Sequence, residues 1–91
     1  MKYSLTKVGS PYVGDSGPMS MLIWPVDGGQ VETEQNARPR VGCSIRVGSP
    51  YARTFEAQDW WQTSLIQEIL VDEPEYVKFR TMNSVYEWKI F

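Results

Sequence analysis

Alternation of apolar and polar side chains is clearest near the end of the printed sequence. In residues 76–81 every second side chain is apolar or threonine and falls on one face of an extended chain, and residues 85–90 alternate similarly. A period of two is typical of half-buried strands. Both segments are therefore predicted to be strands, joined by a tight two-residue turn at Met82 and Asn83.

Two more strand signals precede this hairpin. Residues 41–47 alternate, and Cys43 falls on their apolar face, so we expect a small core residue, with a reactive thiol as the alternative. Residues 19–26 are almost continuously apolar and are followed by Asp-Gly-Gly at 27–29, a composition typical of hairpin turns. Together with residues 30–34, the apolar segment is predicted to form a hairpin.

The apolar segment 19–26 needs a cover on both faces. A small domain would struggle to supply one, and Pro25 argues against a central strand. We therefore expect an edge strand that is used for homo-oligomerisation. Trp24 and Trp88 lie in apolar segments and are predicted to pack in the core or at a subunit interface.

Residues 55–71 fit two structures. Trp61 and Leu65 are four residues apart, as on one face of a helix. Residues 66–71 also suit a strand that pairs with the next strand through a short acidic turn. We favour the strand, which leaves at most one short helix near residues 55–64.

These elements predict a mainly β, antiparallel fold within one domain that spans residues 1–91. Residues 41–91 form a β-meander or a small SH3-like barrel, and residues 1–37 add an N-terminal hairpin. A closed or nearly closed arrangement protects the strand edges from pairing with other chains.

The pentapeptide Val-Gly-Ser-Pro-Tyr occurs at residues 8–12 and again at 47–51, each time after a basic residue. Gly-Ser-Pro is favourable turn chemistry, so the two copies are predicted to be strand ends followed by the same turn. A duplicated ligand-contacting loop is the alternative interpretation.

Composition narrows the function. The chain has 91 residues, with 9 basic and 11 acidic side chains, no histidine and one cysteine. The commonest general base and every imidazole or four-thiolate metal site are therefore missing, and we expect no enzyme, no metal and no cofactor. The net charge of −2 makes nucleic-acid binding unlikely. No apolar run is long enough to span a membrane and no signal peptide is evident, so we expect a cytoplasmic protein.

A binding signal lies between residues 38 and 61. The stretch 38–53 contains four arginines and no acidic residue, and aromatic residues interleave with it or follow it. Arginine suits phosphate and aromatic faces stack on bases, whereas the alternative is ordinary surface arginines beside tryptophans that fill the core. If the barrel closes, the last hairpin adds two more polar residues. The predicted ligand-binding residues are Arg40, Arg46, Tyr51, Arg53, Trp60, Trp61, Arg80 and Asn83.

Residues 41–91 resemble short proteins encoded by phages and prophages. The resemblance is carried by Trp-Gln-Thr-Ser at 61–64, Glu-Ile-Leu at 68–70, and the strand segments 76–81 and 83–88. Among such proteins are anti-defence factors. Some are sponges that sequester cyclic nucleotide or cyclic ADP-ribose signals without cleaving them, and others block CRISPR effectors by binding protein. The resemblance implies a phage context and a host-cytoplasmic site of action.

Two functions follow from these observations. The first is capture of a small nucleotide-derived anion by a non-enzymatic, oligomeric β protein. The second is a protein-interaction module that docks its arginine and aromatic face onto a host or phage protein. Single-stranded nucleic-acid binding ranks below both because of the acidic balance.

Overall fold

The computed structural model describes residues 2–25, 31–49 and 59–91, and within these ranges the chain forms nine strands and no helix. All strand pairs are antiparallel. The expectation of a mainly β, antiparallel fold is confirmed. None of the described segments is a helix that could cross a lipid bilayer.

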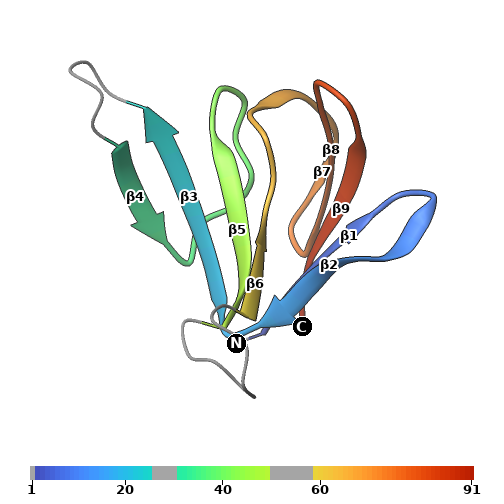
Figure 1. The fold of residues 1–91 in the computed structure, drawn as a ribbon, viewed down its shortest axis with the longest axis horizontal. Helices are drawn as coiled ribbons and strands as arrows, with labels where there is room; N and C mark the ends of the chain where they lie inside the picture. Colours follow the sequence, from blue (N-terminus) through green and yellow to red (C-terminus); the bar gives the residue numbers. More distant parts are fainter. Residues whose placement is uncertain (1, 26–30, 50–58) are drawn as a thin grey trace.

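The strands form two sheets. Sheet A has the order β2-β1-β9-β8-β7, and sheet B the order β4-β3-β5-β6. Figure 1 shows the β3–β4 hairpin at one side of the molecule and the β1–β2 hairpin at the other. The strands of sheet A are β1 (Tyr3–Lys7), β2 (Ser10–Gly17), β7 (Ile66–Glu73), β8 (Tyr76–Thr81) and β9 (Val85–Ile90). Those of sheet B are β3 (Met19–Pro25), β4 (Val31–Gln35), β5 (Ser44–Ser49) and β6 (Asp59–Gln62).

The predicted strands near the end of the sequence are confirmed. β7, β8 and β9 are consecutive neighbours in sheet A, so the strand alternative for residues 66–71 is the right one. The tight turn at residues 82–83 is closed by a 2.8 Å bond from the Thr81 amide to the Ser84 carbonyl. The short helix considered near residues 55–64 lies partly outside the described residues, and from Asp59 to Gln62 the chain is a strand.

The first 37 residues are more deeply integrated than a single added hairpin. They supply two hairpins, β1–β2 in sheet A and β3–β4 in sheet B. β1 also pairs with β9, which places the two ends of the printed sequence side by side in one sheet. Gly14 permits the close β1–β2 approach, because a Cβ there would lie 1.9 Å from the Leu5 carbonyl oxygen.

The edge-strand prediction for residues 19–26 is wrong. β3 is central, with β4 on one side and β5 on the other. Pro25 is tolerated because the pairing with β5 runs only from Met19 to Ile23, so its missing N–H lies beyond that ladder. The expectation that a small domain would struggle to cover both faces of this strand is also wrong, since Leu22 lies in the main core and Met21 in a second cluster of the same chain.

The two copies of the pentapeptide do not form the same turn in the described residues. Val8 and Gly9 make the turn between β1 and β2, where Gly9 has a φ of 83°. Val47, Gly48 and Ser49 instead continue strand β5. The difference arises because β5 pairs on both sides with neighbouring strands at these positions. The rest of the second copy lies outside the described residues.

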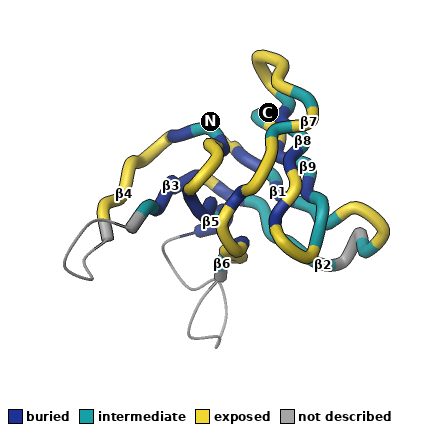
Figure 2. The backbone as a smooth tube through the Cα atoms, turned by 90° about the horizontal axis from the view of Figure 1, so that it is seen from above, coloured by how far each residue is buried: buried dark blue, intermediate teal, exposed yellow. Residues whose placement is uncertain are grey.

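The main core lies between the sheets. Trp88, Phe79, Leu22, Ile45 and Val47 are fully buried there, and Cys43 is buried among them, as predicted. Figure 2 shows that buried residues concentrate where the sheets face each other, whereas most of β4 is exposed. The core prediction for Trp88 is thereby confirmed.

A buried polar bridge joins the sheets through this core. The Trp88 indole N–H of sheet A donates to the Ser20 hydroxyl of sheet B at 2.9 Å. Ser20 in turn donates to the Ala37 carbonyl at 2.8 Å. Because the Trp88 indole N–H, the Ser20 hydroxyl and the Ala37 carbonyl each have a partner, the bridge fixes how one sheet sits on the other.

Candidate ligand-binding site

The structure divides the predicted ligand residues among separate places. Tyr51 and Arg53 lie outside the described residues. Arg46 and Trp60 meet on the outer face of sheet B, while Arg80 and Asn83 both line a cleft at the turn between β8 and β9. The remaining two, Arg40 and Trp61, are engaged elsewhere by other parts of the chain.

Arg46 and Trp60 form a stacked pair. The Arg46 guanidinium lies over the Trp60 ring, 3.9 Å from its centroid. Its Nε and Nη2 both donate to the Gln62 side-chain carbonyl, at 3.0 and 2.7 Å. Burial lowers the pKa of Arg46 below its ordinary value. Trp60 also packs against the Met19, Met21 and Ile23 cluster, so its ring is engaged by the protein itself.

Trp61 points the other way because successive side chains of a strand alternate between faces. Its indole N–H donates to the Tyr86 hydroxyl of sheet A at 3.4 Å. Trp61 is nevertheless 37% exposed. It therefore offers aromatic surface at the end of the molecule where Tyr86 pairs with Lys7 of β1.

The other arginines of the acid-free stretch have structural partners. Arg40 pairs with Glu34 at 3.5 Å and lies 5.8 Å from the Trp24 ring centroid. Arg38 holds the β7–β8 turn, with bonds of 2.7 Å to the Pro74 carbonyl and 2.5 Å to the Asp72 carboxylate. The arginine-rich stretch is thus dispersed by the fold.

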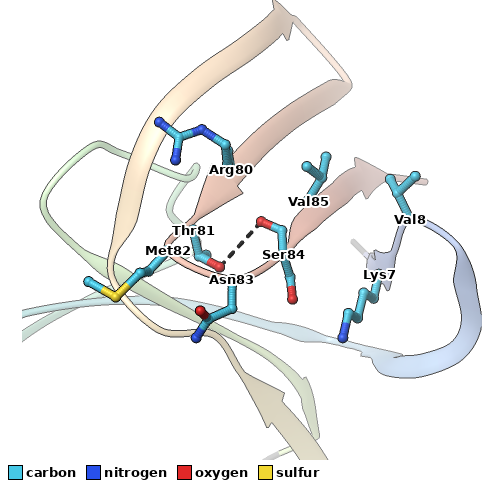
Figure 3. Close-up of a pocket in the computed structure, with 8 residues that line it drawn as sticks. All are labelled: Lys7, Val8, Arg80, Thr81, Met82, Asn83, Ser84 and Val85. Atoms are coloured by element: carbon cyan, nitrogen blue, oxygen red, sulfur yellow. Dashed lines mark hydrogen bonds between the residues drawn. The ribbon is translucent and has the colours of Figure 1, made fainter.

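Arg80 and Asn83 both line an open cleft of about 380 Å³ at the β8–β9 turn. The cleft is lined by Lys7, Val8, Arg80, Thr81, Met82, Asn83, Ser84 and Val85. Figure 3 shows that Lys7 and Asn83 project to one side of the turn and Arg80 to the other.

Backbone pairing builds the cleft. The turn of the β8–β9 hairpin supplies one wall, and the end of β1 supplies the other. A 2.8 Å bond from the Val8 amide to the Val85 carbonyl holds the two walls together. Lys7 is the cation of the cleft lining that the sequence prediction missed, because its place depends on the pairing of β1 with β9.

Charge and polarity of the cleft suit an anion. Lys7 and Arg80 supply positive charge, and Asn83 and Ser84 supply hydrogen-bonding groups. Arg80 is held by an exposed ion pair with Glu68 at 3.4 Å, a contact that a stronger anion can replace. Met82 and Val8, which are 75% and 43% exposed, add apolar surface at the rim.

The described residues hold no group of three or more His, Cys, Asp or Glu side chains arranged for a metal ion. No family model matches the chain, and no curated protein or solved structure shows a significant similarity to it.

Proposed function

We propose that this protein binds a small nucleotide-derived anion without converting it, and acts as a sponge for a signal of the cyclic nucleotide or cyclic ADP-ribose type. The observation that carries the proposal is the open cleft at the β8–β9 turn, whose lining includes Lys7, Arg80 and Asn83. Its volume of about 380 Å³ falls within the range of small-molecule sites.

Each part of such a ligand has a counterpart in or beside the cleft. Lys7 and Arg80 lie on opposite sides of the turn, so each binds a separate anionic oxygen of the ligand, and the Asn83 amide hydrogen-bonds to the sugar or the base. Met82, which is 75% exposed at the rim, contacts the apolar face of the base. The described lining contains no carboxylate, imidazole or thiol, which favours holding a ligand over transforming it.

Isothermal titration calorimetry against a panel of cyclic nucleotides and cyclic ADP-ribose isomers tests the proposal. We expect one member to bind, and Lys7→Met to weaken that binding about ten- to a hundredfold, the loss of one charged hydrogen bond. The control is Lys89→Met, which removes an equal charge from a lysine that lies over the Tyr76 ring and outside the cleft. The absence of heat with every panel member, for folded protein, would refute the proposal.

Glu68 allows a sharper version of the same experiment. Because its carboxylate competes for Arg80, Glu68→Gln should tighten binding of the anion. Arg80→Gln should weaken it, and the double variant should behave like Arg80→Gln alone. Tightening by Glu68→Gln that persists without Arg80 would place the anion elsewhere.

A second candidate function is docking onto another protein, and the exposed side chains of Met82 and Val8 favour it. Exposed apolar residues beside a cation are typical of the centres of protein interfaces. Met82→Asp should then abolish capture of a stoichiometric partner from host lysate, whereas Lys7→Met should only slow association. The expected homo-oligomer stays a prediction, which the mass in solution tests.

A further inference from the structure

The outer face of sheet B points away from the main core. It carries a second group of side chains suited to binding a ligand, separate from the β8–β9 cleft. The strand registers place Gln35, Met21, Arg46 and Gln62 in one row across all four strands. Met19 and Trp60 flank this row, opposite Gly48. The face is therefore built from apolar and neutral polar side chains around a single arginine.

Arg46 is the sole charged residue at the described strand positions of this face. The positions that share it are Met19, Met21, Ile23, Thr33, Gln35, Ser44, Gly48, Trp60 and Gln62. Met19, Met21 and Ile23 are each only 9% exposed, so Arg46 stands beside a largely dry cluster. Its lowered pKa has burial as its cause, which agrees with a cation whose loss of water is incompletely offset.

The guanidinium is also held in place in advance. Stacking on Trp60 at 3.9 Å fixes its plane, and the two bonds from Nε and Nη2 to Gln62 fix its edge. That edge is the one with which arginine grips a carboxylate or a phosphate through parallel hydrogen bonds. In this structure a neutral amide oxygen occupies the position that an anionic oxygen would take.

We propose that Arg46, Trp60 and Gln62 form an oxyanion-binding site that is distinct from the β8–β9 cleft. An incoming carboxylate or phosphate oxygen replaces the Gln62 carbonyl at the Nε–Nη2 edge, and the Gln62 amide rotates so that its NH₂ group donates to the same anion. The exchange is favourable because the guanidinium cation attracts an anionic oxygen more strongly than the neutral oxygen of an amide. Stacking on Trp60 lowers the entropy cost of binding the anion, since the guanidinium is already ordered.

NMR of the arginine Nε–Hε resonances, recorded on isotope-labelled protein, tests this site with inorganic phosphate and with acetate. We expect the Arg46 resonance to move in a saturable way with at least one of the two anions, together with the Gln62 side-chain amide. Acetate and phosphate distinguish a carboxylate ligand from a phosphate ligand. Arg40, which is paired with Glu34, serves as the reference that should not move.

The same spectra distinguish anion binding at Arg46 from anion binding at the β8–β9 cleft. The Arg80 resonance and the Asn83 amide report the cleft, so a response confined to them would contradict an Arg46 site without affecting the proposed function. Movement of Arg46 alone would support this site and leave the cleft to calorimetry. Glu56 is an acid outside the described residues. If the substitution Glu56→Gln moved the Arg46 Nε–Hε resonance, the cation would already have an internal partner, and the proposal would be overturned.

Gln62→Glu gives an independent test because it installs a permanent carboxylate at the guanidinium edge. We expect it to raise the thermal midpoint and to weaken the phosphate or acetate response about tenfold or more. Arg46→Lys keeps the charge but loses the planar edge. It should abolish the response of the Gln62 side-chain amide to both anions. An undiminished response in folded Gln62→Glu protein would contradict the proposed geometry.

Discussion

The outer faces of the two sheets are built from opposite kinds of side chain. On sheet A, polar groups pair across strands: Tyr76 donates to Glu87 at 2.5 Å, and Arg80 meets Glu68 at 3.4 Å. On sheet B, Met21 and its apolar neighbours form a second buried cluster around one arginine. The outer face of sheet A therefore carries paired polar groups, whereas sheet B holds a cation whose described neighbours on the same face are neutral.

The largest expected effect is a difference in how much the two outer faces contribute to the free energy of unfolding. Met21→Ala removes a side chain that is 9% exposed and should lower the free energy of unfolding by about 2–5 kcal/mol. Lys78→Ala on the outer face of sheet A should change it by less than about 0.5 kcal/mol. Urea denaturation of both variants measures the difference. Equal losses would mean that the outer face of sheet B is not the second core that it resembles.

An intermediate effect is expected for the bridge between the sheets. Ser20→Ala leaves the Trp88 indole N–H and the Ala37 carbonyl without their buried partner, and should cost about 1–3 kcal/mol of unfolding free energy. Ser4→Ala, at a half-buried position of β1, is the control, with a change within about 0.5 kcal/mol. A loss at Ser20 no greater than at Ser4 would show that packing alone fixes the sheets.

The smallest effect is a pH dependence of sheet A. The hydrogen bond to Glu87, followed by burial and by the charges of Glu87 and Glu73, raises the pKa of Tyr76 from 10.0 to about 12. Since the folded pKa lies above the unfolded one, this contribution is present below pH 10 and is lost as the pH rises through about 12.

The absorbance of tyrosinate, taken as the difference between wild type and Tyr76→Phe, measures that titration. Glu87→Gln removes the largest cause of the shift and should return the midpoint toward 10.0. If the titration midpoint of Tyr76 were unchanged in Glu87→Gln, this cross-strand pair would not be formed. The contrast between the two faces would then be weaker.

The parts of the fold that sequence alone could predict are those with local connections. β7, β8 and β9 follow one another through short turns, and the buried face of β8 was predicted residue by residue from its alternation. The pairing of β1 with β9 joins residues at opposite ends of the sequence, and no local pattern encodes such a partner. The division of the first 37 residues between two sheets was missed for the same reason.

In the candidate site, too, local neighbours could be predicted from the sequence and long-range neighbours could not. Arg80 and Asn83 share one hairpin and could be predicted together, whereas Lys7 reaches them only through the β1–β9 pairing. Trp60 and Trp61 are neighbours in sequence but lie on opposite faces of β6. Assigning residues 59–62 to a strand would have separated them, because side chains alternate along a strand.

The arginines show why residue counts are a poor guide to a site. Arg38, Arg40 and Arg46 lie within a short acid-free stretch, yet the structure gives each a different neighbourhood. Arg38 holds the β7–β8 turn, Arg40 pairs with Glu34, and Arg46 stacks on Trp60. Proximity in sequence predicted one patch, whereas Arg38 and Arg40 lie between β4 and β5 and Arg46 lies within β5.

The most direct test of the central claim, capture of a nucleotide-derived anion at the β8–β9 cleft, is an NMR titration with the panel member that binds in calorimetry. The account predicts saturable shifts of the Asn83 amide and the Arg80 Nε–Hε resonance, their loss in Lys7→Met, and recovery of the ligand chemically unchanged. A bound ligand that leaves Asn83 and Arg80 unmoved, or that is recovered as a cleaved product, would contradict it.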